Sequence, residues 1–145
     1  MSSEIKQYET LHALFNAVER APRDDRAQIL KANNSIGVRD VLKINFDKNV
    51  DLGLPEGSPP YTPFEVSGAK DTPPKRLANE TPRLRSLLPS SGAIRAKAEA
   101  EFISILENID PLDAKVLILA KDRTLAKRFK VLSLKLIEEA FPGLL

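Results

Sequence analysis

The chain has 145 residues, of which 42% are hydrophobic and 29% are charged, and its formal net charge is +2. A chain of this length and composition is typical of one globular domain with a buried core. It contains no cysteine and a single histidine, His12, which excludes disulfides, a thiol nucleophile, thiolate metal sites and any site built from several histidines.

Residues 1–46 have the apolar spacing of three short helices. Thr10 is the expected N-cap of the first helix, and Pro22 ends it. The second helix is expected to stop at Asn33-Asn34, because asparagine tolerates a left-handed backbone, and Ser35 is expected to cap the third. Short helices bury little surface alone, so we expect them to pack on one another or on the C-terminal half.

Residues 47–74 lose this periodicity. Six of the eleven prolines lie here, and because proline fixes φ and has no N–H donor, no helix or central strand can run through residues 54–63. We predict an extended belt that packs on the helices, with a free tail as the alternative. Exposed aromatic side chains are typical binding anchors, so Tyr61 and Phe64 are candidate partner-binding residues.

Residues 75–145 return to helical patterning. Thr81-Pro82 is expected to start a helix, with threonine as the N-cap and proline in the first turn. A longer helix is predicted over residues 93–108. The sequence Asp110-Pro111-Leu112-Asp113 predicts another start, in which the first carboxylate caps and the second reaches back as in a capping box. Ser133 is expected to start the last helix.

These patterns predict a mainly α fold. We expect a single domain over residues 1–145, a helical bundle of short helices with a central Pro-rich extended belt. Its parts are an N-terminal helical block at 1–46, the Pro-rich segment at 47–74 and a C-terminal helical block at 75–145.

Two stretches are rich in basic residues. Residues 70–97 contain seven basic and two acidic side chains, and residues 121–130 contain five and one. A solvated basic face and an anionic partner both explain such a pattern. Nucleic acid is the weaker alternative, because Phe129 is the only aromatic residue in these stretches and its place suits a core. Three residues are taken as candidate partner-binding residues: Arg123, Lys127 and Arg128.

No catalytic signature is present. The carboxylate pairs Asp24/Asp25, Glu99/Glu101 and Glu138/Glu139 diverge on a helix, and the glycines lack the spacing of a phosphate loop. Residues 110–141 have the order of a helix-turn-helix, but carboxylates in the recognition position repel phosphate, so a core hairpin is favoured. We therefore predict no enzyme activity, no catalytic or metal-binding residue and no cofactor.

Nine short segments, in this order along the chain, carry a family resemblance: Leu30–Ser35, Arg39–Lys43, Phe46-Asp47, Leu54–Gly57, Pro60–Pro63, Phe102–Glu107, Asp113–Leu117, Lys121-Asp122 and Glu139–Gly143. Through them the chain resembles a family of small conserved proteins of T-even-like tailed phages, of the type found in marine cyanophages and alphaproteobacterial phages. The resemblance implies a viral origin and a host-cell setting, and no activity. Residues 68–97 depart from the family pattern, because they form a basic, alanine-rich stretch and lack an expected Gly-Gly pair.

The function we expect is binding of a protein partner, viral or host, by a non-enzymatic phage protein. One alternative is a virion structural or accessory protein whose Pro-rich arm locks onto neighbouring subunits. The other is a nucleic-acid-binding accessory protein that uses the stretches 70–97 and 121–130. With no membrane-length apolar run and no signal-peptide pattern, we expect no membrane partner and a location in the host cytoplasm or the virion.

Overall fold

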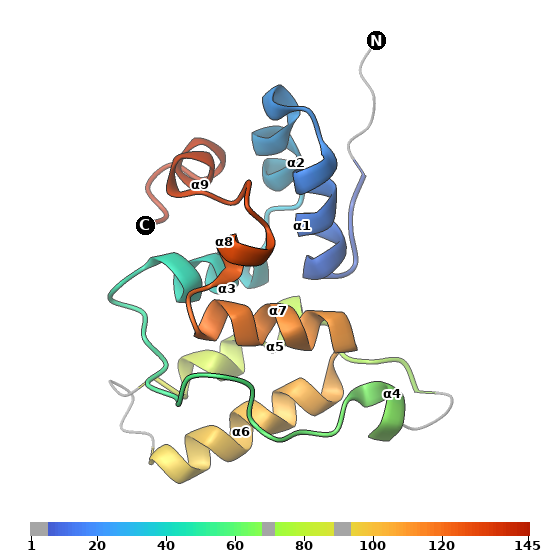
Figure 1. The fold of residues 1–145 in the computed structure, drawn as a ribbon, viewed down its shortest axis with the longest axis vertical. Helices are drawn as coiled ribbons and strands as arrows, with labels where there is room; N and C mark the ends of the chain where they lie inside the picture. The colour runs from blue at the N-terminus through green and yellow to red at the C-terminus, as the bar shows by residue number, and fades with distance from the viewer. Residues whose placement is uncertain (1–5, 68–71, 89–93) are drawn as a thin grey trace.

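The computed structural model describes residues 6–67, 72–88 and 94–145. Within these ranges the chain is helical and has no strand, which confirms the prediction of a mainly α bundle (Figure 1). The helices are α1 (Leu11–Arg20), the short 3-10 helix η1 (Arg23–Asp25), α2 (Arg26–Ala32), α3 (Ile36–Phe46), α4 (Phe64–Ser67), α5 (Leu77–Arg85), α6 (Arg95–Asn108), α7 (Pro111–Lys121), α8 (Leu125–Arg128) and α9 (Leu134–Ala140).

Several helices start where the sequence predicts them, because a side chain caps each one. The hydroxyls of Thr10 and Ser35 accept from the backbone N–H groups three residues later, both at 3.1 Å. Ser133 does the same for α9 at 3.1 Å, and Asp110 caps α7 by accepting from Leu112 at 2.9 Å. Each cap satisfies an N–H group that has no partner inside its helix.

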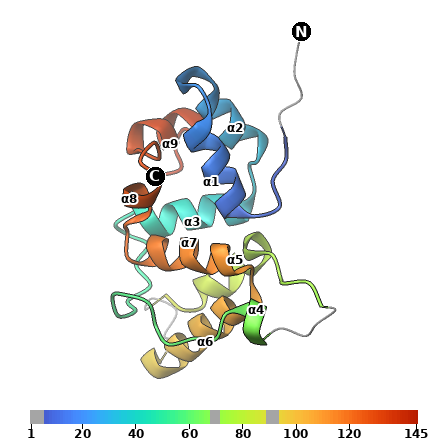
Figure 2. The ribbon, with the colours of Figure 1, turned by 45° about the vertical axis from the view of Figure 1, so that its right-hand side comes forward.

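Helix α7 lies at the centre of the fold. It packs against α1, α3, α6 and α8, and the two views show it between the upper helices and α6 (Figures 1 and 2). Val116, Leu117 and Ala120 are buried, as expected for a stretch that is apolar all round. Phe102 of α6 is buried in the same cluster as Leu14 of α1, so both halves of the chain share one core.

The start predicted for α5 is wrong. The helix begins at Leu77, and Pro82 lies inside it. Pro82 has no N–H for the carbonyl of Ala78, but the Thr81 hydroxyl donates to that oxygen at 3.5 Å. Burial of Leu77 and Leu84 holds both ends of the helix against the core, so packing overrides the local preference of proline for a helix start.

Asp113 does not reach back as in a capping box. Its two carboxylate oxygens accept from the backbone N–H groups of Leu11 at 3.1 Å and His12 at 2.8 Å. A residue of α7 therefore caps the first turn of α1, about a hundred residues earlier in the chain.

The Pro-rich segment is a belt that lies on the helices. We use "the belt" for residues 47–67, which descend from the end of α3 and then pass below α7 and across α6 to α4 in both views (Figures 1 and 2). Leu52 is buried, and Tyr61 packs against the core, as the prediction of a packed belt requires. The belt ends in α4, a short helix that the sequence did not predict. Two predicted features lie partly outside the described residues: the basic stretch, at residues 70–71 and 89–93, and the start of the long helix at residue 93.

Candidate functional site

A groove of about 570 Å³ opens between the belt, α7, α8 and the start of α1. The belt contributes Ser58 and Tyr61, α1 contributes His12, and the end of α8 contributes Arg128 with the adjoining Phe129. Helix α7 forms the floor. The groove is therefore built from three parts of the chain that are distant in the sequence: the start of α1, the belt, and α7 with α8.

The floor of the groove is an apolar face of α7. Leu112, Val116 and Leu119 line it at helical spacing. Val116 is buried, whereas the side chain of Leu112 remains 47% exposed. The apolar stripe of the central helix is thus exposed at Leu112, partly exposed at Leu119 and buried between them at Val116.

The wall opposite the belt combines aromatic rings with a cation. The Phe129 ring is buried and meets the rings of His12 and Phe15 edge to face, with centroids 5.8 and 5.7 Å apart. The guanidinium carbon of Arg128 lies 4.6 Å from the centroid of the Phe129 ring. This cation–π contact holds an exposed positive charge at the rim of the groove.

The belt wall carries Tyr61, which is half-buried. Burial, and to a smaller extent the charge of Glu65, raise the pKa of its phenol above 10. The phenol is therefore protonated at neutral pH and can donate a hydrogen bond. Phe64 is also half-buried, but it begins α4, which packs on α6, and it does not line the groove.

The three basic candidates do not point to one surface. Arg123 has a positive φ of 59°, and its guanidinium donates to the carbonyls of Asp47 and Val50, both at 2.8 Å. Lys127 and Arg128 are exposed on α8. Of the candidates named from the sequence, the structure brings Tyr61 and Arg128 together at the groove, and it engages Arg123 with the start of the belt.

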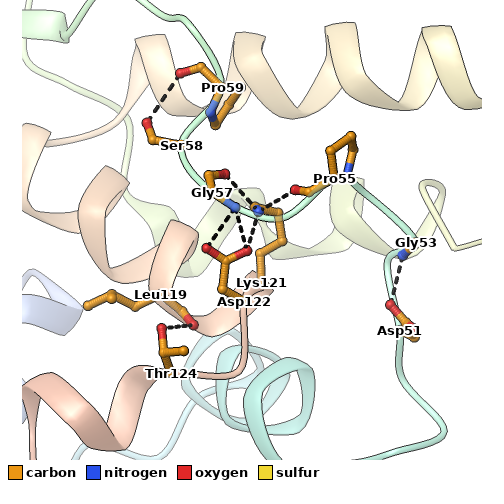
Figure 3. Close-up of polar contacts among 10 residues, drawn as sticks. All are labelled: Asp51, Gly53, Pro55, Gly57, Ser58, Pro59, Leu119, Lys121, Asp122 and Thr124. Atoms are coloured by element: carbon orange, nitrogen blue, oxygen red, sulfur yellow. Dashed lines mark hydrogen bonds and ion pairs between the residues drawn. The ribbon is translucent and has the colours of Figure 1, made fainter.

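The residues next to Arg123 hold the middle of the belt (Figure 3). The ammonium of Lys121, whose side chain is 2% exposed, donates to the carbonyls of Pro55 at 2.7 Å and Gly57 at 2.9 Å and pairs with Asp122. The Asp122 carboxylate accepts from the Gly57 N–H at 3.1 Å. Lys121 and Asp122 therefore form a clasp that fixes the belt beside the groove.

Sequence reasoning missed this clasp, although a signal for it exists. Prolines in a belt contribute carbonyl acceptors without contributing N–H donors, so a belt rich in proline requires donors from elsewhere. Cationic side chains supply them here. Lys121 donates to Pro55 and Gly57, and the half-buried Arg95 of α6 donates to Leu52 at 2.7 Å.

We expect Lys121→Met to loosen the belt. Methionine keeps the apolar stem, but the Asp122 carboxylate loses its ion-pair partner and the carbonyls of Pro55 and Gly57 lose their donor. This loss should lower the free energy of unfolding by about 1–3 kcal/mol. Hydrogen–deuterium exchange should rise around Gly57. Lys127→Met, at an exposed lysine of α8, is the control, and equal exchange in the two variants would show that the clasp does not hold the belt.

Residues 13–127 match the model of a family of unknown function (DUF6433). The chain belongs to this family. No curated protein and no solved structure matches the chain.

The DUF6433 span contains the belt, the clasp and the floor of the groove, since all of them lie between residues 13 and 127. His12 lies just before the span, and Arg128 and Phe129 lie just after it. The match therefore includes the belt wall and the floor, and the aromatic and cationic wall lies at its edges.

Among the described residues, no group of three or more His, Asp or Glu side chains is placed to hold a metal ion. Glu101, one of the carboxylates considered from the sequence, forms an ion pair with Arg83. In the described part of the chain, no helix has the length and apolar character that crossing a membrane requires.

Proposed function

We propose that this protein is a non-enzymatic binding module that holds a segment of a protein partner in the groove between the belt and α7. One observation carries the proposal: Tyr61 and Arg128, which were singled out independently in two distant segments, line the same groove. Tyrosine and arginine are among the residues that most often dominate binding energy, and here they flank an open apolar floor.

The rigidity of the groove also favours binding. The belt wall is fixed by the clasp at Gly57, and Glu107 of α6 accepts from the Thr62 N–H at 2.8 Å. The opposite wall is fixed by the edge-to-face contact of the Phe129 and His12 rings. A surface that is ordered before binding loses less entropy when the partner arrives.

The setting we propose follows from the resemblance to proteins of T-even-like phages: the cytoplasm of an infected bacterium, with a viral or host protein as partner. A virion role would use the Pro-rich segment as an arm over a neighbouring subunit, whereas the belt lies on its own core. A nucleic-acid role would use the basic residues 121–130, of which Lys121 and Arg123 are engaged with the belt. These contacts favour protein binding.

The test is affinity capture from infected cells with variants of the tagged protein. We expect the partner captured by the wild type to be lost with Tyr61→Ser and with Arg128→Glu, since both side chains line the groove. Helical circular dichroism should be unchanged in both variants.

Two control variants make the result specific. Lys31→Glu reverses an exposed charge on α2, and Phe64→Ser removes an aromatic ring of α4 outside the groove. Both should capture the partner as the wild type does. Loss with Phe64→Ser but not with Tyr61→Ser, or unchanged capture by both groove variants, would show that the groove is not the binding surface.

A further inference from the structure

The charges around the groove are unequal at its two sides. Lys115 and Arg128 are exposed cations, and no carboxylate is among the residues that line the groove. Burial is the largest cause that lowers the pKa of His12. The charges of Arg128 and Lys115 lower this pKa further, whereas the charge of Asp110 raises it, so both cations lie near His12. His12 is therefore neutral at neutral pH, and the positive charge of this side comes from lysine and arginine.

The belt side has the opposite character. Tyr61 lies close enough to Glu65 for that carboxylate to raise the pKa of its phenol. A negative group of a ligand is therefore attracted to the side of α1 and α8 and repelled at the belt. Between the two sides runs the apolar stripe of α7, from Leu112 to Leu119, which spans about 10 Å at the rise of an α-helix.

We infer that the groove selects an acidic segment of a protein in which carboxylates lie next to a large apolar side chain. The inference rests on the proposed function and specifies its partner. The carboxylates would pair with Lys115 and Arg128, and the apolar side chain would cover the α7 stripe beside Tyr61. Complementary charge of this kind sets specificity and association rate, and the apolar contact adds affinity.

A nucleic acid fits the groove less well. Phosphates would be attracted to the same cations, but bases need exposed aromatic faces for stacking. The Phe129 ring is fully buried, and the floor is aliphatic. The partly exposed rings of the groove are those of Tyr61 on the belt side and His12 on the side of α1 and α8.

Fluorescence anisotropy with synthetic peptides of equal length tests the inference. The first probe alternates glutamate with leucine and phenylalanine, and the second has glutamine in place of each glutamate. The third keeps glutamate but has serine in place of the apolar residues. The fourth probe is a single-stranded oligothymidylate. We expect the first probe to bind at least about tenfold more tightly than each of the others, with an affinity that falls as salt rises.

Charge reversal in the protein provides the decisive comparison. Arg128→Glu and Lys115→Glu should each weaken the glutamate probe about tenfold and strengthen a probe with lysine in place of glutamate, whereas Lys31→Glu should do neither. Leu112→Ser, at an exposed position, should weaken binding of both the glutamate probe and the lysine probe. Equal binding of the glutamate and glutamine probes would overturn the inference, as would tighter binding of the oligothymidylate.

The proposed function of the groove and its preference for acidic segments can fail separately. If cellular capture is lost with Tyr61→Ser but kept with Arg128→Glu and Lys115→Glu, the groove binds a partner and the acidic chemistry is wrong. If the glutamate probe binds with the expected charge dependence but cellular capture is unchanged in every groove variant, the groove prefers acidic segments and the proposed function is wrong.

Discussion

Gly37→Ala is expected to destabilise the protein, although alanine is the better helix former. Gly37 lies inside α3, where replacing glycine by alanine favours the helix by about 1 kcal/mol. A Cβ at this position, however, would lie 2.3 Å from the Cα and 2.5 Å from the carbonyl oxygen of Ala78 in α5. Both are backbone atoms, so no side-chain rotation relieves the contact, and α5 must move away from α3.

The expected net loss is about 2–3 kcal/mol of unfolding free energy, the upper part of the range for overpacked cores. Displacing α5 also loosens Leu77 and Leu84, which are buried against the core. Urea unfolding followed by circular dichroism measures the change. Ile36→Ala, at the exposed neighbouring position, is the matched control.

A second variant separates the backbone contact from simple crowding of side chains. Ala78→Gly removes the Cβ of residue 78, which would lie 2.7 Å from the new atom, but it leaves the closer Cα and oxygen in place. It should therefore not restore the stability of Gly37→Ala. A Gly37→Ala protein that is more stable than the wild type would contradict the close approach of α3 and α5.

The helices themselves were largely predictable, because their signals are local. Thr10, Ser35 and Ser133 cap helices at the expected positions, since an N-cap depends on a few neighbouring residues. The proximity of Gly37 to Ala78 was not predictable, because a glycine within a helix looks the same in sequence whether or not another backbone approaches it. The error at Thr81-Pro82 has the same origin: a local rule was overridden by burial of the flanking leucines.

The candidate site was predictable only in parts. Tyr61 and Arg128 were identified as binding candidates from the composition of their segments, but their meeting at one groove depends on the path of the belt over α7. That path is fixed by Lys121 and Arg123, which the sequence presents as members of a basic run. Whether a cation is free or bonded to a distant carbonyl is decided by tertiary contacts, so charge counting overestimates the exposed positive surface.

Asp113 is expected to make stability depend on pH in an unusual direction. Burial raises the pKa of its carboxyl to about 6, with a smaller contribution from Asp110, while the N–H groups of His12 and Leu11 act in the opposite sense. A carboxyl whose pKa is higher in the folded state than its ordinary value of 3.8 binds its proton more tightly when folded. Its contribution to stability is therefore fully present below about pH 4 and is lost as the pH rises through about 6.

Comparison with Asp113→Asn isolates this contribution, because the amide does not titrate. The unfolding free energy of the wild type minus that of the variant should fall by about 2 kcal/mol between about pH 4 and pH 7, from a pKa difference of about two units. At low pH the variant should be clearly the less stable protein, since an amide has one acceptor oxygen for two N–H groups.

Urea unfolding of both proteins across this range measures the difference, and NMR titration of the carboxyl carbon gives the pKa directly. Asp25→Asn, at an exposed carboxylate of η1, is the control for effects of the substitution alone. A difference that stays constant between about pH 4 and pH 7 would contradict the burial of the Asp113 carboxylate, because a carboxyl that remains in water has the same proton affinity in the folded and unfolded chains. In that case the N-terminus of α1, and with it His12 at the groove, would not be held by α7.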